Sequence, residues 1–279
     1  MKEVIISNSD FSEIKKRIIY EGVENLHVIA DFDKTLTKTF VGSKHTPSIL
    51  SELRSRNILG ENFSKESKKL YDEFHPIELD HLVDENIRDA KMNEWWSKVF
   101  DLLKKEGLNK SHLEEVVNCG DVQLRDGVED FLRFLREMHV PVIILSASGI
   151  GDLIPMFLKS KGLLYDNITV VSNFFDWDSE GNMKAHVGPI IHSENKGEAA
   201  VEKFPVYEKL LERRNVLIFG DSLGDVEMIG KFPYENLLKF GFLNEKVDER
   251  IDEYRKRYDC VILNDGNFEF VNNFLEDFL

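Results

Sequence analysis

The fold is decided by residues 26–37, which read Leu26-His27-Val28-Ile29-Ala30-Asp31-Phe32-Asp33-Lys34-Thr35-Leu36-Thr37. The first five residues form an apolar run suited to a buried strand, and we interpret its one polar member, His27, as a hydrogen-bonded structural histidine. The run ends on Asp31 and Asp33, and because an unpaired buried carboxylate is costly, these charges need a partner. Ligands of parallel α/β sheets bind beyond the carboxyl ends of the strands. The stretch therefore predicts a Mg²⁺-dependent phosphate site, with a strand and a polar turn as the alternative.

The composition is that of an acidic globular protein. The chain has 279 residues, 42% of them hydrophobic, which is enough for one large α/β domain or a domain with an insert. The net charge of −15 argues against a nucleic-acid-binding surface, since such surfaces are basic. A phosphate site in this chain therefore needs local positive charge from a metal, a lysine or helix N-termini.

The compartment is inferred from features that the sequence lacks. Two cysteines are too few for a disulfide framework, and the first residues do not resemble a signal peptide. No apolar run approaches the roughly 20 residues that a membrane span needs. Nothing in the sequence points to an obligate oligomer. We therefore expect a soluble cytoplasmic monomer that binds neither a membrane nor a nucleic acid polymer.

Strands and helices alternate through most of the chain. We predict strands at 26–30, 140–145, 168–171, 216–219 and 260–263, a β-hairpin at 174–187, and helices at 11–20, 128–138, 153–161, 196–204 and 206–212. Residues 40–118 are charged and helical in pattern, with amphipathic helices at 64–74 and 88–106 and Pro76 breaking the pattern between them. Such alternation is typical of a parallel sheet with helices on both faces.

Two parts of the chain are therefore distinguished. We predict a doubly wound, Rossmann-like α/β catalytic core formed by residues 1–39 and 119–279, with a β-hairpin near 172–190. Residues 40–118 are predicted to form a helical cap domain inserted after the first strand. The cap is expected to pack over the end of that strand.

Three of the apolar strands end on residues that can handle a phosphoryl group. The first ends on Asp31 and Asp33, the second on Ser146-Ala147-Ser148-Gly149, and the fourth on Gly220-Asp221, with Asp225 shortly after. Lys196 lies between the second and fourth strands, at an expected helix start. Each motif alone is explained by an ordinary loop or a solvated lysine. Their occurrence together at the ends of parallel strands favours one shared site.

Taken in order, these motifs resemble those of the haloacid dehalogenase superfamily of phosphotransferases. The matching residues are Asp31-x-Asp33-x-Thr35, Ser146, Lys196 and Gly220-Asp221-x-x-x-Asp225. The resemblance implies that Asp31 is the nucleophile forming an aspartyl-phosphate, and that Asp33 is the general acid and base. It implies Mg²⁺ on the Asp31 carboxylate, the Asp33 main-chain carbonyl and Asp221. Ser146, Ala147 and Lys196 would bind the phosphoryl group. Thr35 and Asp225 would be supporting residues, with Asp225 orienting Lys196 or a metal-bound water.

Nearly the whole chain resembles the cytosolic pyrimidine 5′-nucleotidase family. The stretches that carry this likeness are 74–80, 92–96, 171–174 and 241–244. Such proteins have a helical cap after the first motif and hydrolyse nucleoside 5′-monophosphates, typically pyrimidine ones, while one branch takes 7-methylguanosine monophosphate. The resemblance thus implies a Mg²⁺-dependent 5′-nucleotidase that hydrolyses UMP or CMP to nucleoside and phosphate.

By the same resemblance, the cap would read the base. Glu78 would bind the base, and Trp95, or else Trp96, would supply an aromatic face, where stacking contributes roughly 1–3 kcal/mol. The competing interpretations are a solvated loop carboxylate for Glu78 and helix packing for the tryptophans.

The chain departs from the family pattern at two positions. Family members usually read Ser-Ala-Gly-Ile-Gly-Asp after the second strand, whereas residues 146–152 here read Ser-Ala-Ser-Gly-Ile-Gly-Asp. The extra residue leaves Ser146 or Ser148 as the phosphate ligand, and Ser146 is favoured because it directly follows the strand. Val99 replaces a hydroxyl-bearing residue of the cap helix, which leaves the base preference open.

Two other functions compete with a nucleotidase. A phosphatase of the same mechanism would act on another small phosphomonoester, such as phosphoserine, although Glu78 would repel the substrate's own carboxylate. A non-catalytic nucleotide-binding protein would be expected to lack an essential group, yet both Asp31 and Asp33 are present.

Overall fold

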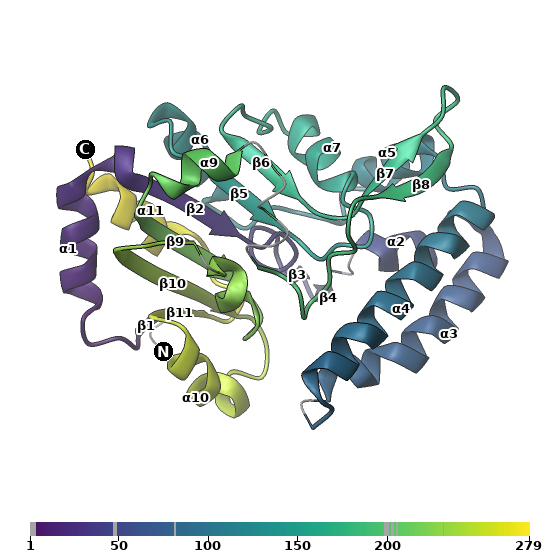
Figure 1. Ribbon diagram of the computed structural model, residues 1–279, viewed down its shortest axis with the longest axis horizontal. Coiled ribbons are helices and arrows are strands. Elements are labelled where there is room, and N and C mark those ends of the chain that lie inside the picture. The colour runs from purple at the N-terminus through teal and green to yellow at the C-terminus, as the bar shows by residue number, and fades with distance from the viewer. Residues whose placement is uncertain are drawn as a thin grey trace.

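The computed structural model describes residues 4–46, 49–80, 82–197, 201, 204, 206–230 and 232–279. Within these ranges the chain forms a seven-stranded sheet in the order β1-β11-β10-β9-β2-β5-β6 (Figure 1). Neighbouring strands run parallel, except that β1 pairs antiparallel with β11 at the edge. The strands are β1 (Val4–Ile6), β2 (Leu26–Ala30), β5 (Val142–Leu145), β6 (Ile168–Val171), β9 (Asn215–Gly220), β10 (Asn236–Leu243) and β11 (Cys260–Leu263). The predicted α/β fold with a mainly parallel sheet is confirmed.

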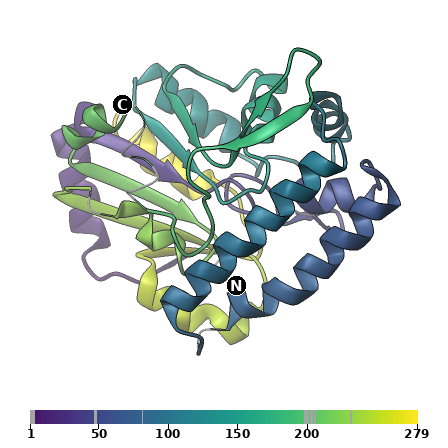
Figure 2. The ribbon, with the colours of Figure 1, turned by 45° about the vertical axis from the view of Figure 1, so that its right-hand side comes forward.

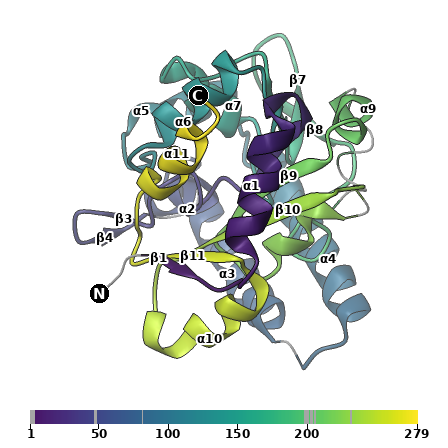
Figure 3. The same ribbon diagram turned by 90° about the vertical axis from the view of Figure 1, so that its left-hand side faces the viewer.

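Helices cover both faces of this sheet. On one face pack α1 (Phe11–Glu21), α6 (Val128–Glu137), α7 (Leu153–Ser160) and α11 (Glu269–Glu276). On the other pack α9 (Val206–Leu211), α10 (Val247–Arg257) and the short 3-10 helix η2 (Asp225–Ile229). Another 3-10 turn, η1 (Val23–Asn25), leads into β2. Figure 3 shows α1 lying against the sheet, where it packs on β10.

The central strands are apolar because both of their faces are buried. In β2, the side chains of Val28 and Ile29 pack in the hydrophobic clusters on opposite faces of the sheet. His27 on the same strand is fully buried, and its Nδ1 lies 3.0 Å from the main-chain oxygen of Arg213. The prediction of a hydrogen-bonded structural histidine is confirmed.

A helical segment follows β2. After the small hairpin β3 (Phe40–Val41) and β4 (Lys44–His45) come α2 (Ile49–Ser55), α3 (Gly60–Leu79), α4 (Glu85–Lys105) and α5 (Lys110–Asn118). Helices α3 and α4, which we call the cap hairpin, lie side by side and project away from the sheet (Figures 1 and 2). The limits of a cap domain at residues 40 and 118 stay a prediction. The other hairpin, β7 (Phe174–Trp177) and β8 (Met183–Val187), lies where the sequence predicts it.

Pro76 does not break the helical pattern, and this part of the prediction is wrong. Helix α3 continues through Pro76 to Leu79. Proline removes one backbone hydrogen bond and crowds the preceding turn, but Pro76 lies in the last turn of the helix. The ring of Phe74 is fully buried and stacks against that of Trp95 on α4. This packing opposes the local preference of the proline.

Some elements differ from the prediction or lie outside it. The sequence reasoning missed β1, β10, α2, α5, α10 and α11. The helix that we predict at 196–204 falls largely on residues outside the described ranges. Within those ranges, no helix is both long and apolar enough to cross a membrane.

Candidate active site

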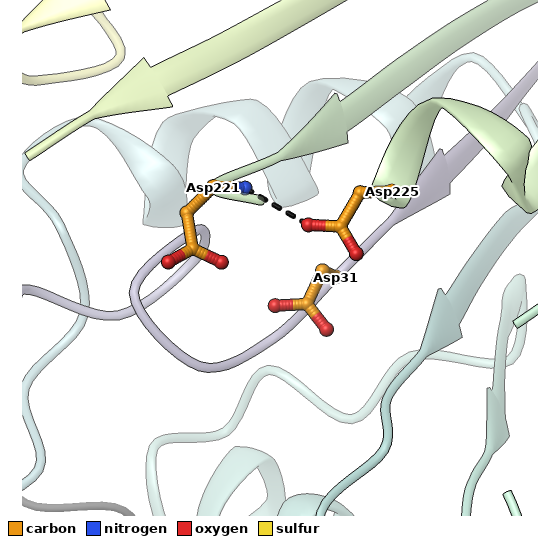
Figure 4. A group of neighbouring side chains, drawn as sticks. All are labelled: Asp31, Asp221 and Asp225. Atoms are coloured by element: carbon orange, nitrogen blue, oxygen red, sulfur yellow. Dashed lines mark hydrogen bonds between the residues drawn. The ribbon is translucent and has the colours of Figure 1, made fainter. Parts of the chain in front are cut away.

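Three aspartates meet where two neighbouring strands end. Asp31 follows β2, Asp221 follows β9, and Asp225 begins η2. One carboxylate oxygen of each lies within 4.8 Å of the others (Figure 4). The main-chain N–H of Asp31 donates to the oxygen of Phe219, 2.9 Å away, which ties the end of β2 to β9. The parallel pairing therefore brings together carboxylates that are far apart in the sequence.

Asp225 is held in a fixed orientation. Its Oδ2 accepts hydrogen bonds from the main-chain N–H groups of Asp221 at 3.1 Å and Ser222 at 2.9 Å. A Cβ on Gly220 would lie 2.3 Å from the Cβ of Asp225, so the approach requires glycine at position 220. Since its oxygens are occupied by donors from the chain, Asp225 is suited to a supporting role.

Lys196 supplies the positive charge that the aspartates need. Its Nζ lies 2.5 Å from Oδ1 of Asp31 and 2.9 Å from Oδ1 of Asp225. Only 9% of the side chain is exposed. Burial opposes the ammonium charge, but the carboxylates of Asp225 and Asp31 outweigh it and raise the pKa of Lys196.

The charges of Lys196 and Lys34 do not balance the carboxylates of the site. Burial raises the pKa of Asp31 well above its usual range, although Lys196 partly offsets this effect. Burial, with the nearby charge of Asp225, raises the pKa of Asp221 to about 7. Burial also raises the pKa of Asp33 to about 6, against the opposing charges of Lys196 and Lys34. Clustered carboxylate oxygens with too little positive charge around them fit a hard divalent cation such as Mg²⁺.

The cluster differs in one respect from the predicted ligand set. The side chain of Asp225, and not that of Asp33, joins Asp31 and Asp221 in the described acidic cluster. Because Asp33 is predicted to bind through its main-chain carbonyl, its place among the ligands stays a prediction. Thr35 is buried, and its hydroxyl lies 3.5 Å from Oδ2 of Asp31, as a supporting residue would.

The serine loop after β5 reaches the same site. Ser146 is buried, and its Oγ accepts a hydrogen bond of 3.2 Å from the main-chain N–H of Ser148. The hydroxyl of Ser146 thus keeps its own proton to donate. The amide Nδ2 of Asn173 donates to the main-chain oxygen of Ser148 at 3.0 Å, which fixes the position of the loop. Both serines line the cavity described next, so the choice of Ser146 over Ser148 as the phosphate ligand stays a prediction.

A cavity of about 680 Å³ connects the strand ends with the cap hairpin. The predicted site residues on its wall are Asp31, Asp33, Glu78, Trp95, Ser146, Ala147, Lys196 and Asp221. Trp96 and Val99 also line it. Sequence reasoning missed Arg54, Tyr71 and His75, which line it as well. Residues 71, 75 and 78 follow the i, i+4, i+7 spacing of one helix face, and that spacing was the available signal.

The cap tryptophans belong to a stack of rings. Trp95 lies between Phe74 and Trp96, with ring centroids 6.1 and 5.5 Å away and planes within 16° of parallel. Trp95 is 6% exposed, whereas Trp96 is half-buried and continues the stack to Phe100. Trp95 thus has a packing role, and its contact with a base stays a prediction.

Glu78 is not a solvated loop residue. It lies in the last turn of α3 and is half-buried. Its Oε1 accepts a hydrogen bond of 2.8 Å from the hydroxyl of Ser193, in the segment that leads to Lys196. Glu78 therefore both lines the cavity and connects the cap hairpin to the core.

A family model and curated relatives that match the chain are all described as 5′-nucleotidases. The model of a family described as "Pyrimidine 5'-nucleotidase (UMPH-1)" matches residues 34–279. The 7-methylguanosine phosphate-specific 5'-nucleotidase A of Xenopus laevis is 34% identical over 261 residues, which cover 93% of this chain and 90% of that protein. The corresponding human protein is 34% identical over 259 residues, covering 92% and 86%.

Solved structures agree on the architecture. The crystal structure of cytosolic 5'-nucleotidase IIIB bound to cytidine superposes with a TM-score of 0.87 at 26% identity, covering 100% of this chain and 93% of that one. Phosphoserine phosphatase in its apo form has a TM-score of 0.53 at 18% identity, and this likeness concerns the fold alone. The chain is an enzyme of the 5′-nucleotidase class and belongs to the pyrimidine 5′-nucleotidase (UMPH-1) family of haloacid dehalogenase-like hydrolases.

Proposed function

We propose that this enzyme is a Mg²⁺-dependent phosphatase of nucleoside 5′-monophosphates, with UMP and CMP as its first candidate substrates. The observation that carries this proposal is that one cavity is lined both by Asp31, Lys196 and Ser146 and by Glu78 and Trp96 of the cap hairpin. Its volume of about 680 Å³ lies in the range of small-molecule sites. Such a cavity accommodates a phosphate at the strand ends and a base at the cap.

The first half of the reaction assigns separate roles to the two aspartates of β2. A carboxylate oxygen of Asp31 attacks phosphorus, forming an aspartyl-phosphate while the bond from phosphorus to the nucleoside O5′ breaks. Asp33, with its pKa raised to about 6, retains a protonated fraction near neutral pH and gives that proton to O5′. Lys196 turns from Asp31 to the phosphoryl oxygens while its contact with Asp225 is retained.

The second half reverses the proton transfer. The Asp33 carboxylate takes a proton from the water that attacks phosphorus, the bond to Asp31 breaks, and inorganic phosphate leaves. Asp31, the main-chain carbonyl of Asp33 and Asp221 would hold Mg²⁺, which, when bound, offsets the negative charge of phosphate among these carboxylates. The hydroxyl of Ser146 donates a hydrogen bond to a phosphoryl oxygen.

The second candidate substrate is 7-methylguanosine monophosphate. Its base carries a positive charge, which suits a carboxylate such as Glu78 and a parallel aromatic stack. Proteins named for this substrate are also among the relatives described above. Phosphoserine is disfavoured because its carboxylate would meet that of Glu78.

A phosphate-release screen tests the proposal. UMP, CMP, 7-methylguanosine monophosphate, phosphoserine and sugar phosphates are compared with Mg²⁺ present. We expect a nucleotide to be hydrolysed fastest, EDTA to stop turnover and Mg²⁺ to restore it. Asp31→Asn should abolish turnover with an unchanged circular dichroism spectrum. Preference for phosphoserine would refute the substrate class, and an active Asp31→Asn variant would refute the covalent mechanism.

We also propose that the enzyme is a cytoplasmic monomer. Cys260 is buried, Cys119 is only half-buried, and neither forms a disulfide. The free thiols suit a reducing compartment. Size-exclusion chromatography with light scattering tests the oligomeric state, and a dimer mass would contradict it. Imaging of a tagged chain tests the compartment.

A further inference from the structure

Three side chains of the cap hairpin contact the segment that carries Lys196. We call residues 190–197 the lysine loop. Nη2 of Arg88 donates to Oε2 of Glu194 at 2.9 Å, and its Nε donates to the same oxygen at 3.1 Å. Nδ2 of Asn93 lies 3.0 Å from Nε2 of His192. Together with the bond between Ser193 and Glu78, these contacts fall on three consecutive loop residues just before Lys196.

The contacts with the cap are largely shielded from water. The side chains of Arg88 and Glu194 are 14% and 15% exposed, and His192 is fully buried. Surface ion pairs contribute little to stability because water screens them, whereas shielded pairs interact more strongly. Nη1 of Arg88 also donates to the main-chain oxygen of Val83, 3.2 Å away in the turn between α3 and α4. Arg88 therefore joins this turn of the cap hairpin to the lysine loop.

The start of the lysine loop is held by the core instead. The buried amide of Asn173 exchanges two hydrogen bonds of 2.8 Å with the main chain of Ile191. The same Nδ2 contacts the serine loop at Ser148. Within the loop, Asn195 accepts from the N–H of His192 and donates to the oxygen of Ile190, both at 2.8 Å. The core thus fixes the beginning of the loop, and the cap contacts its middle, next to Lys196.

We propose that the cap hairpin positions Lys196 for phosphate binding through the Arg88–Glu194 pair and its two neighbouring contacts. Arg88, Asn93 and Glu194 do not line the cavity, so they act through the loop and not on the substrate. Glu78 does line it and also binds Ser193, so engagement of a nucleoside by the cap is coupled to the placement of Lys196. This inference rests on the proposed function, because it assumes that Lys196 binds the phosphoryl group.

Arg88→Gln and Glu194→Gln test the pair with two substrates and one inhibitor. p-Nitrophenyl phosphate has no nucleoside, and inorganic phosphate probes the phosphate site directly. We expect each variant to lower kcat/KM for the nucleotide and for p-nitrophenyl phosphate, and to raise the Ki of phosphate, each by about tenfold, in the middle of the range for coupled neighbouring residues. The charge-exchanged double variant R88E/E194R should recover part of this loss, since it restores the ion pair but not the hydrogen bond from Arg88 to Val83.

Glu94→Gln is the matched control. Glu94 lies on the same helix α4 and pairs with Lys91 and Lys98 on its exposed side. All three kinetic values should stay unchanged in this variant. A loss confined to nucleotides in Arg88→Gln would show that Arg88 acts on the nucleoside, and a lower Tm with unchanged kinetics would show a structural role. Either result overturns the inference, and Glu194→Gln provides the same test if Arg88→Gln does not fold.

Lys196→Met separates the two levels of the proposal. Unchanged turnover and an unchanged Ki of phosphate in this variant would refute the assumed role of Lys196, and the inference with it. If Lys196→Met loses both turnover and phosphate inhibition while Arg88→Gln and Glu194→Gln have normal kinetics, only the role of the cap hairpin is refuted.

Discussion

His27 makes the stability of the fold depend on pH. It lies in the central strand β2, its Nδ1 contacts the main-chain oxygen of Arg213, and its Nε2 has no hydrogen-bond partner among the described residues. Because a carbonyl oxygen only accepts, Nδ1 carries the proton and Nε2 is bare. The centroid of its ring lies 5.9 Å from that of the Phe232 ring. A proton on Nε2 would bury a charge without an acceptor, and burial lowers the pKa of His27 to about 4.

The sign and size of the effect follow from this shift. In the unfolded chain a histidine titrates near 6.5. Between pH 6.5 and 4 the unfolded state binds a proton that the folded state does not bind, so the free energy of unfolding falls as the pH falls. At about 1.36 kcal/mol per pH unit, His27 removes about 2 kcal/mol at pH 5 and about 3 kcal/mol at pH 4. Above pH 6.5 this histidine adds no pH dependence.

Urea unfolding of the wild type and of His27→Leu, followed by circular dichroism between pH 7.5 and 5, measures this effect. The buried carboxylates of the site also titrate, but they are present in both proteins and cancel in the difference. From pH 7.5 to 5 the difference in unfolding free energy should move by about 2 kcal/mol in favour of the variant. His139→Asn, at an exposed histidine, is the control variant. A difference between wild type and His27→Leu that is constant with pH would refute the reasoning.

Two further predictions concern packing around the site. Arg125 is 1% exposed, donates to the main-chain oxygens of the two residues after Asp33, and pairs with the carboxylate of Asp265 at 2.8 Å. Arg125→Leu should therefore lower the unfolding free energy by about 3–5 kcal/mol, because it leaves the shielded charge of Asp265 without its partner. Arg133→Leu, which breaks the exposed pair with Asp130, should lower the unfolding free energy by less than about 0.5 kcal/mol in urea unfolding. Equal losses of unfolding free energy in the two variants would contradict this account. A Cβ on Gly149 would lie 2.3 Å from the ring of Trp96, so Gly149→Ala should raise the KM for nucleotides. That effect should vanish in a Trp96→Ala background, and its persistence would exclude this clash as the cause.

The sequence alone was sufficient to predict the strands that are buried on both faces. β2, β5 and β9 read as continuous apolar runs, and the polar residue that ends each run marks the strand's carboxyl end. This is why Asp31, Ser146 and Asp221 were recognised as neighbours before their distances were known. Lys196 and Asp225 were found beside these strand ends, and the resemblance to the superfamily then gave each a role.

The sequence alone was not sufficient to predict features that depend on tertiary contacts. β10 was missed because Lys239 and Gly241 interrupt its apolar run. Position 241 needs glycine because a Cβ there would lie 2.5 Å from the ring of Tyr258, a contact that no local pattern indicates. The Arg88–Glu194 pair joins residues 106 positions apart, and one sequence carries no signal for such a pairing.

The two halves of the site are supported from different parts of the molecule. Arg125, from the core, donates hydrogen bonds to the main-chain oxygens of Lys34 and Thr35. The backbone of Lys34 has a φ of 60°, which residues other than glycine rarely adopt. The turn after Asp33 is thus held whatever the cap hairpin does. The loop that carries Lys196 is in addition bound by Arg88 of the cap hairpin, through Glu194. Loss of the Arg125 contacts should therefore reduce stability and proton transfer together, whereas loss of the Arg88 contacts should above all weaken phosphate binding. If Asp33 moves the proton and Lys196 holds the phosphate, as we propose, the first is held by contacts from the core alone and the second also by contacts from the cap hairpin.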